Sequence, residues 1–172
     1  MTSIPTLETQ HLILRAPCAD DFEALAEFMA SDRAKGAGGP ANRSDAWKGL
    51  AMVIGHWNLR GYGLWHADEK STGKLVGRFG FWNPEGWLGR ELGWMVFEGF
   101  EGKNYAYEAS AFLLDYAYNT LKWDSLISTI APDNTRSITL AKRLGAQYQQ
   151  DWVSPSGKAS VIYRHPAPEV VQ

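Results

Sequence analysis

The chain has 172 residues, of which 45% are hydrophobic and 21% charged, and its formal net charge is -2. This composition is typical of a folded globular protein, and it excludes a global basic field for nucleic acid and a polybasic membrane anchor. One cysteine and four scattered histidines predict neither an intrachain disulfide nor a metal site.

The length suits one domain over residues 1–172, with a core at about residues 7–165 and a loose tail at residues 166–172. The pattern predicts no secretory signal and no apolar run of about 18 residues, the length that spans a bilayer. We therefore expect a cytoplasmic protein without a membrane or nucleic-acid partner. Eight tryptophans are an unusual number, and exposed ones would favour a homodimer.

The first third of the chain predicts one strand and two helices. A short apolar run ends at Pro17, and Asp20 and Glu23 have the spacing of a capping box at the start of a helix. A glycine-rich segment separates this helix from a second one, which begins at Ser44 and ends at Gly61. The expected order is a strand at 11–15, a helix from 20, a loop at 36–42 and a helix at 44–61.

The rest of the chain predicts strands first in a meander and then in alternation with helices. The most regular apolar spacing predicts a long helix, and Gly145 has the position of a C-terminal cap for the last helix. This order indicates an α/β fold with a mixed sheet covered by helices. The expected elements are strands at 63–67, 74–82 and 88–96, a helix at 103–121, a strand at 125–130, a helix from about 132 to 144, and strands at 148–153 and 159–164.

A predicted phosphate site lies where the strand that contains Glu91 runs into the long helix. The tight turn contains Gly102, and the first N–H groups of any helix lack internal partners and lie at the positive end of its dipole. Such a turn offers several amide donors to a phosphate, and Lys103 adds positive charge. The segment up to Ala106 therefore predicts an anion-binding turn.

Four motifs in sequence order carry a resemblance to a known family. They are Thr6–Arg15 with Asp20–Phe22, Lys74–Gly77, Glu91–Val96 with Gly102–Ala109, and Pro132–Ser137 with Leu144–Gly145. On these motifs the chain resembles the GCN5-related N-acetyltransferases (GNAT), specifically the branch of the ribosomal-protein N-terminal acetyltransferases. The resemblance spans roughly residues 7–164, which is nearly the whole chain.

The resemblance implies the GNAT-type acyl-CoA N-acyltransferase fold, a mixed and largely antiparallel sheet flanked by helices. It implies acetyl-CoA as cosubstrate, no metal, and direct transfer of the acetyl group to a primary amine in a ternary complex. The amine belongs either to a protein or peptide N-terminus or to a small molecule. The implied cofactor-binding residues are Met95 and Val96 for the pantetheine arm, Glu101, Gly102, Lys103, Asn104, Tyr105 and Ala106 for the diphosphate, and Asn134 and Ser137 near the thiol.

The chain departs from the family pattern at three positions. Asn104 stands where the family usually has Gly, but Asn is the residue besides Gly that best adopts a left-handed backbone. Glu101 stands where Gln or Arg is common, and we expect its side chain to point away from the diphosphate. Ala141 stands where many members have a Tyr that acts as general acid. Asn134 is equally suited to cap the following helix or to contact the cofactor.

The candidate general base is Glu91, because a carboxylate beside the thioester can accept a proton from the attacking amine. The alternatives are that Glu91 is a solvated strand residue or that it pairs with Arg78 or Arg90. Ser137 is the nearest polar substitute for the missing general acid, and a bound water is another. The missing Tyr leaves a second hypothesis for the whole chain, a catalytically weak or inactive CoA-binding module that acts as a sensor or interaction domain.

Overall fold

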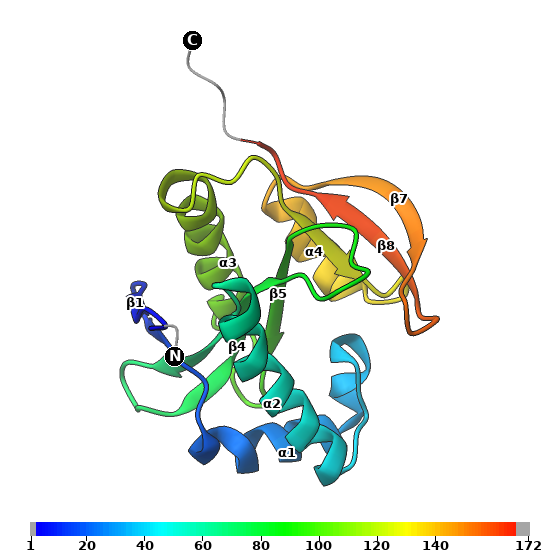
Figure 1. The fold of residues 1–172 in the computed structure, drawn as a ribbon. Helices are drawn as coiled ribbons and strands as arrows, with labels where there is room; N and C mark the ends of the chain where they lie inside the picture. Colours follow the sequence, from blue (N-terminus) through cyan, green and yellow to red (C-terminus); the bar gives the residue numbers. More distant parts are fainter. Residues whose placement is uncertain (1–2, 168–172) are drawn as a thin grey trace.

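A computed structural model describes residues 3–167, which form one mixed sheet of eight strands with helices on both faces (Figure 1). The strands are β1 (Leu7–Glu8), β2 (Leu12–Arg15), β3 (Leu64–Glu69), β4 (Leu75–Trp82), β5 (Glu91–Val96), β6 (Ile127–Ile130), β7 (Gln147–Val153) and β8 (Ala159–Arg164). The helices are α1 (Phe22–Ala30), α2 (Arg43–Arg60), α3 (Tyr105–Asp115) and α4 (Thr135–Arg143), with short helical segments η1 (Ala19–Asp21), η2 (Asp32–Ala37) and η3 (Tyr116–Thr120).

The sheet has the order β1-β2-β3-β4-β5-β6-β8-β7, and every neighbouring pair is antiparallel except β5 and β6. This confirms the predicted α/β fold with a mixed, largely antiparallel sheet. Leu113 of α3 packs with Phe79 on one face, and Leu25 of α1 and Leu50 of α2 pack with Met95 on the other. Within residues 3–167 no helix is long and apolar enough to cross a bilayer.

The N-terminal part of the chain differs from the prediction in two ways. A two-residue strand, β1, precedes the predicted strand and pairs with it, because the chain turns back where the amide of Thr9 donates to the carbonyl oxygen of Leu12 (3.0 Å). The predicted capping box of Asp20 and Glu23 is wrong, because a helical turn already begins at η1. Glu23 instead pairs with Arg43 of α2 (2.7 Å).

The segment at 36–42, predicted to be irregular, is partly helical, because η2 extends into it. Helix α2 begins at Arg43, one residue earlier than expected, since the side-chain oxygen of Asn42 accepts a hydrogen bond from the amide of Asp45 (2.9 Å). It ends as predicted at Gly61, whose φ of +76° is left-handed.

The long predicted helix is shorter at its start than the apolar spacing indicated. Helix α3 begins at Tyr105 rather than at Lys103, because Asn104 has a left-handed φ of +65° and cannot continue a helix. Its last turn is π-helical, as η3. Gly145, with a φ of +85°, ends α4 as predicted. Most of the predicted C-terminal tail, residues 168–172, lies outside the described residues.

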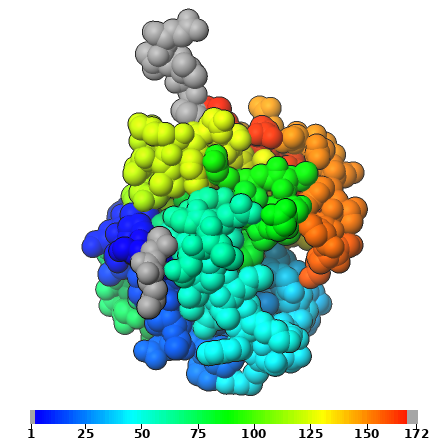
Figure 2. Space-filling model, viewed as in Figure 1, coloured from blue at the N-terminus to red at the C-terminus, as the bar shows by residue number. Residues whose placement is uncertain are grey.

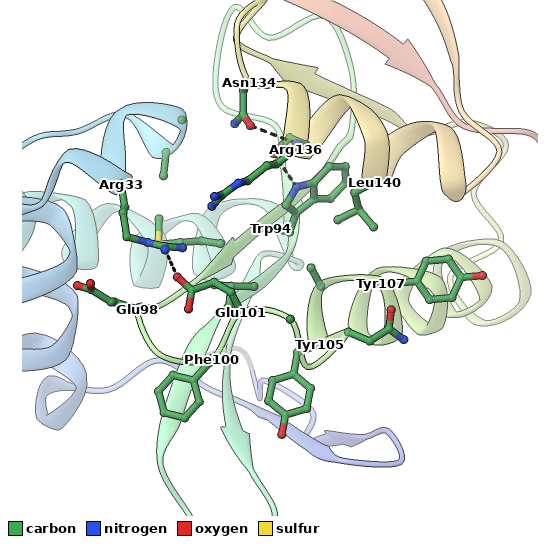
Figure 3. A pocket seen from close by; sticks show the side chains of 18 of the residues that line it. Arg33, Trp94, Glu98, Phe100, Glu101, Tyr105, Tyr107, Asn134, Arg136 and Leu140 are labelled. Carbon is green, nitrogen blue, oxygen red and sulfur yellow. Dashed lines mark hydrogen bonds and ion pairs between the residues drawn. The ribbon is translucent and has the colours of Figure 1, made fainter.

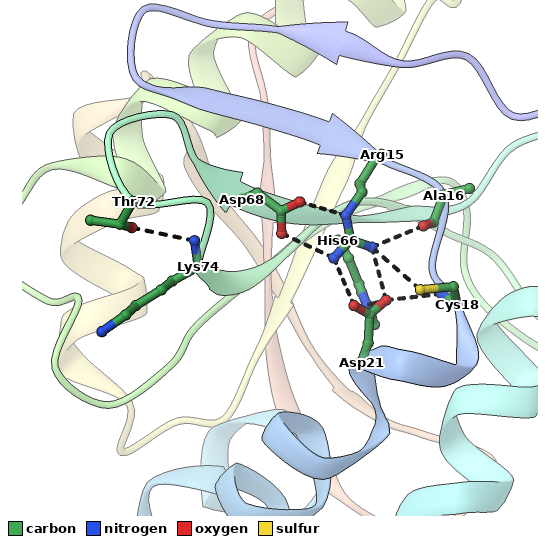
Figure 4. A network of polar contacts seen from close by, with 8 residues as sticks. All are labelled: Arg15, Ala16, Cys18, Asp21, His66, Asp68, Thr72 and Lys74. Atoms are coloured by element: carbon green, nitrogen blue, oxygen red, sulfur yellow. Dashed lines mark hydrogen bonds and ion pairs between the residues drawn. The ribbon is translucent and has the colours of Figure 1, made fainter.

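A buried ionic network joins the start of α1 to β2 and β3 (Figure 4). Asp21 accepts hydrogen bonds from the amide of Cys18 (2.8 Å) and from both terminal nitrogens of Arg15 (2.7 and 3.0 Å). Nδ1 of His66 lies 2.7 Å from the same carboxylate. Burial alone would raise the pKa of Asp21, but hydrogen bonds from His66 and Arg15 hold it far below its usual range. The network fixes α1 on the sheet.

Replacing Asp21 with Ala should lower the free energy of unfolding by about 3–5 kcal/mol, because it leaves Arg15 and His66 without their buried partner. Urea unfolding at pH 7 measures this. The matched control is Glu23→Ala, since Glu23 pairs with Arg43 on the surface and its removal should leave stability nearly unchanged. Equal losses in the two variants would contradict the central role of the buried network.

Candidate functional site

β5 and β6 run parallel but share a single pair of opposite residues, Glu91 and Ile127. A side chain joins the strands at the next position, because Ser128 Oγ donates to the carbonyl oxygen of Leu92 (2.7 Å). On its other edge β6 pairs with β8 along its whole length, from Ile127 to Ile130. The sheet therefore opens after Leu92, and the last residues of β5 border a cleft.

The backbone groups that face this opening follow from the alternation along β5. The carbonyl oxygen of Leu92 accepts a hydrogen bond from β6, whereas the amide of Phe97 donates to β4 (2.8 Å). Because successive strand residues direct their N–H and C=O groups to opposite sides, those of Trp94 and Val96 face the opening and those of Met95 face β4. The geometry therefore supports the backbone of Val96 as a candidate for binding the pantetheine arm. In place of the predicted backbone of Met95, it points to the backbone of Trp94.

The cleft has a volume of about 1100 Å³ and lies between η2, the turn from β5 to α3, and α4 (Figure 3). Two predicted site residues, Glu91 and Lys103, do not line it. The other predicted residues do, and they are Met95, Val96, Glu101, Gly102, Asn104, Tyr105, Ala106, Asn134 and Ser137.

The turn from β5 to α3 contains three left-handed residues, and the two nearest to the helix are Gly102 (φ +74°) and Asn104 (φ +65°). The left-handed backbone expected at Asn104 is confirmed. Its side-chain oxygen accepts a hydrogen bond from Arg143 of α4 (2.6 Å), whose guanidinium lies 3.8 Å from the ring centre of Tyr107. Helix α3 begins directly afterwards, so its free N-terminal amides and positive dipole end lie at the cleft.

The ammonium of Lys103 does not point at the cleft as predicted, because Glu69 of β3 binds it on the other side of the turn (2.8 Å). Glu69 also accepts hydrogen bonds from the hydroxyls of Thr72 (2.6 Å) and Tyr105. Hydrogen bonds from Lys103, Thr72 and Tyr105 lower the pKa of Glu69 to about 2. The charge of Lys103 therefore anchors the turn to the sheet, and only its amide remains a candidate phosphate donor.

The side chain of Glu101 was expected to point away, and this is wrong, because Arg33 of η2 reaches across the cleft and pairs with it (Figure 3). Arg136 of α4 also extends into the cleft and makes no ion pair with any residue of the described part. Neither arginine was predicted from the sequence as a site residue. Arg33 lies next to a glycine-rich segment that carries no motif, so nothing in the sequence marked it. Arg136 lies two residues after the predicted site residue Asn134, and this position could have indicated that it lines the cleft.

Asn134 and Ser137 lie together at the start of α4. The side-chain oxygen of Asn134 accepts a hydrogen bond from the amide of Ser137 (3.1 Å), so the predicted capping role is confirmed, and its amide nitrogen takes no part in the cap. The indole N–H of Trp94 donates to Ser137 Oγ (3.1 Å), which leaves the hydroxyl proton for another acceptor. Ala141 is fully buried against Ile130, so no polar group reaches the cleft from that position.

Glu91 lies at the other end of β5, partly buried, and its carboxylate accepts a hydrogen bond from the indole N–H of Trp87 (2.6 Å). Burial raises the pKa of Glu91 to about 7, although the bond from Trp87 opposes this. The alternative pairings are wrong, because Arg90 lies 3.7 Å from Asp124 and Arg78 makes no ion pair with any described residue. A carboxyl group with this pKa can exchange a proton near neutral pH.

Comparison with known proteins gives one matching family model, an acetyltransferase (GNAT) domain, over residues 11–147. The uncharacterized protein YkkB of Bacillus subtilis is 34% identical over 102 residues, which are 55% of this chain and 59% of that relative. An acetyltransferase of Agrobacterium tumefaciens, solved by crystallography, is 35% identical, with 95% of both chains covered and a TM-score of 0.88.

A more distant solved structure shares the fold alone. It is RimL, a ribosomal L7/L12 alpha-N-protein acetyltransferase in complex with coenzyme A, with 16% identity and a TM-score of 0.74. The superposition covers 95% of this chain and 98% of RimL.

The Glu91 carboxyl should titrate with a midpoint near pH 7 in a carbon-13 NMR titration, because burial disfavours its ionised form. Replacing Trp87 with Phe should move the midpoint higher, since the lost indole N–H stabilises the carboxylate. A midpoint near that of a free Glu side chain, or a downward shift in Trp87→Phe, would contradict the burial of this group.

Proposed function

The chain belongs to the GNAT acetyltransferase family, and we propose that it transfers the acetyl group of acetyl-CoA to a primary amine by direct attack in a ternary complex. The amine belongs to a small molecule or to a protein or peptide N-terminus. The observation that carries the proposal is the cleft, which joins an amide-rich helix start to an opening in the sheet. A carboxyl group with a pKa near neutrality lies on the same strand, at Glu91.

The donors of the cleft fit a diphosphate. The turn at Gly102 and Asn104 aims the first amides of α3 at the cleft, where the helix dipole adds positive potential. Arg136 lines the cleft and makes no ion pair with any residue of the described chain, so its charge is available to a phosphate. Arg33 is paired with Glu101, and a diphosphate would compete with this carboxylate for it. Both guanidinium groups suit phosphate oxygens because they offer paired N–H donors.

The opening of the sheet fits the pantetheine arm. The backbone groups of Trp94 and Val96 face it and are free to bind amides as a neighbouring strand would. The side-chain nitrogen of Asn134, which the helix cap does not use, is a further donor in the cleft. Bound there, acetyl-CoA supplies the activated acetyl group, and the protein supplies its orientation.

Two side chains of the protein handle protons in this proposal. Glu91, with a pKa raised to about 7, accepts a proton from the amine directly or through water. Ser137 directs its hydroxyl proton to the leaving thiolate, since the indole of Trp94 already donates to its oxygen. The second candidate is a CoA-binding module without turnover, and the buried methyl group of Ala141 favours it because no phenol acts from there.

Replacing Asn104 with Val should weaken CoA binding about tenfold, because a left-handed backbone costs a β-branched residue roughly 1–2 kcal/mol. Isothermal titration with CoA measures this. Asn104→Gly is the matched control, since it also loses the bond to Arg143 but keeps the left-handed turn, and it should bind nearly as the parent does. Equal affinities of the Val and Gly variants would count against the turn geometry.

Replacing Glu91 with Gln should lower acetyl transfer about 100-fold at pH 7 and leave CoA affinity nearly intact. In the parent protein kcat/KM should rise with pH through about 7, because ionised Glu91 is the base, and this inflection should vanish in the variant. A thiol-release assay with a broad panel of amines measures both effects. CoA binding without turnover on any amine would favour the inactive module instead.

A further inference from the structure

A buried serine and a buried histidine meet at the point where β5 and β6 separate. Ser128 of β6 is 1% exposed, and His165, which follows β8, is 2% exposed. Ser128 Oγ lies 2.7 Å from the carbonyl oxygen of Leu92 and 2.8 Å from Nε2 of His165. A carbonyl oxygen can only accept, so the hydroxyl donates to Leu92 and accepts from the Nε2–H of His165. The pair therefore forms a directed chain of two hydrogen bonds that ends on β5.

The histidine of this chain of hydrogen bonds is neutral. Its Nδ1 is sealed from solvent and has no hydrogen-bond partner among the described residues, and burial lowers the pKa of His165 to about 4. With its one ring proton on Nε2, the imidazole is a donor to Ser128 near neutral pH. A buried nitrogen without a partner costs stability, so packing alone does not account for a histidine at this position.

The hydroxyl of Ser128 occupies the place that a backbone amide has in a continuous parallel ladder. The amide of Ile127 donates to the carbonyl oxygen of Arg90 (3.0 Å). Two residues further along both strands, the next bond in the same direction would join the amide of Thr129 to the carbonyl of Leu92. Ser128 Oγ holds that carbonyl instead, and no ladder pair of the described strands joins Thr129 to β5. The amide of Thr129 therefore faces β5 without a strand partner.

The carboxylate of Glu91 lies at the level of this amide. Gly93 is the residue that a continuous ladder would place opposite Thr129, and a Cβ atom built on Gly93 would lie 3.9 Å from Oε1 of Glu91. The other oxygen, Oε2, accepts the hydrogen bond from Trp87. Trp87 belongs to the loop between β4 and β5, which lies at the surface between α2 and the β7–β8 hairpin (Figure 2). This loop thus holds one oxygen of the carboxylate, and β6 offers an amide to the other.

We propose that Ser128 is a positioning residue for the candidate base: its hydroxyl takes the carbonyl of Leu92 and so leaves the amide of Thr129 to hold the carboxylate of Glu91. The inference rests on the proposed acetyl transfer, in which Glu91 accepts the proton of the amine. Burial raises the pKa of Glu91 to about 7, and contacts with Trp87 and Thr129 oppose this rise, whereas no charged side chain of the described residues contributes to it. One hydroxyl thereby links the opening of the sheet to the position of the base.

The test compares Ser128→Ala with the loss of a second buried hydroxyl. Without the hydroxyl of Ser128, the amide of Thr129 should turn to the carbonyl of Leu92. The midpoint of Glu91 in a carbon-13 NMR titration should then rise by about one unit, as the loss of one hydrogen bond to a carboxylate allows. Ser110→Ala is the matched control, because the hydroxyl of Ser110 is equally buried and has no partner among the described residues. It should leave the midpoint unchanged.

The parent protein offers a second test that needs no variant. The amide proton signal of Thr129 should move downfield with the same midpoint as Glu91, whereas that of Ile127, which is bound within the ladder, should not. In Ser128→Ala this dependence should weaken, and a scalar coupling across a hydrogen bond should appear between the nitrogen of Thr129 and the carbonyl carbon of Leu92. Ser128→Thr retains the hydroxyl and should behave as the parent does.

Acetyl transfer provides a readout that a purely structural serine would not move. In Ser128→Ala the inflection of kcat/KM should move to higher pH together with the midpoint of Glu91. Thiol release at pH 7 should fall about fivefold, because a rise of one unit from about 7 leaves about five times less of the ionised base. The affinity for CoA should stay close to that of the parent, since the turn before α3 is intact. A structural role would lower the melting temperature and leave the inflection in place.

The proposal is overturned if the amide signal of Thr129 in the parent does not follow the titration of Glu91, or if the midpoint of Glu91 is the same in Ser128→Ala as in the parent. If Ser128→Ala does not fold, the titration of the parent alone decides. Failure of the proposed function would appear separately, as absent CoA binding or as no thiol release with any amine, while both NMR titrations would still report on the contact.

Discussion

The limited pairing of β5 with β6 is the constraint on which the rest of the site depends. The two strands share one pair of opposite residues, and the hydroxyl of Ser128, held by His165 (2.8 Å), fastens β6 to the carbonyl oxygen of Leu92. Had the parallel ladder continued, β6 would occupy the backbone groups of Trp94 and Val96. Because it stops, these groups border the cleft, and the strand leads directly into the turn before α3.

The turn itself is held from both sides. Its left-handed residues aim the helix start at the cleft, while Glu69 binds Lys103 and Tyr105 from the sheet. The positive charge that faces the cleft therefore comes from other elements, namely from Arg33 of η2 and from Arg136 and Arg143 of α4. Glu101 lowers the net charge of the cleft and occupies Arg33 when no anion is bound. In the proposed function a diphosphate would replace Glu101 as the partner of Arg33.

The sequence was sufficient for the fold and for the left-handed turn at Asn104, because apolar periodicity, glycine positions and turn residues are local properties. It was insufficient where a side chain's partner is distant in the chain. Lys103 was assigned to a phosphate because Glu69, 34 positions earlier, could not be seen beside it. The same limit hid Arg33, whose partner Glu101 lies on a distant segment of the chain. Strand register decides the backbone orientation of Met95, which was therefore also missed.

The central claim is that amides of the turn before α3 hold the diphosphate of the cofactor. The most direct measurement is an amide NMR titration of the protein with CoA and, separately, with pantetheine, which lacks the diphosphate. The amide signals of Gly102, Asn104, Tyr105 and Ala106 should shift with CoA and stay unchanged with pantetheine, while those of Trp94 and Val96 should shift with both. Unshifted turn amides at saturating CoA would contradict a diphosphate site at this turn.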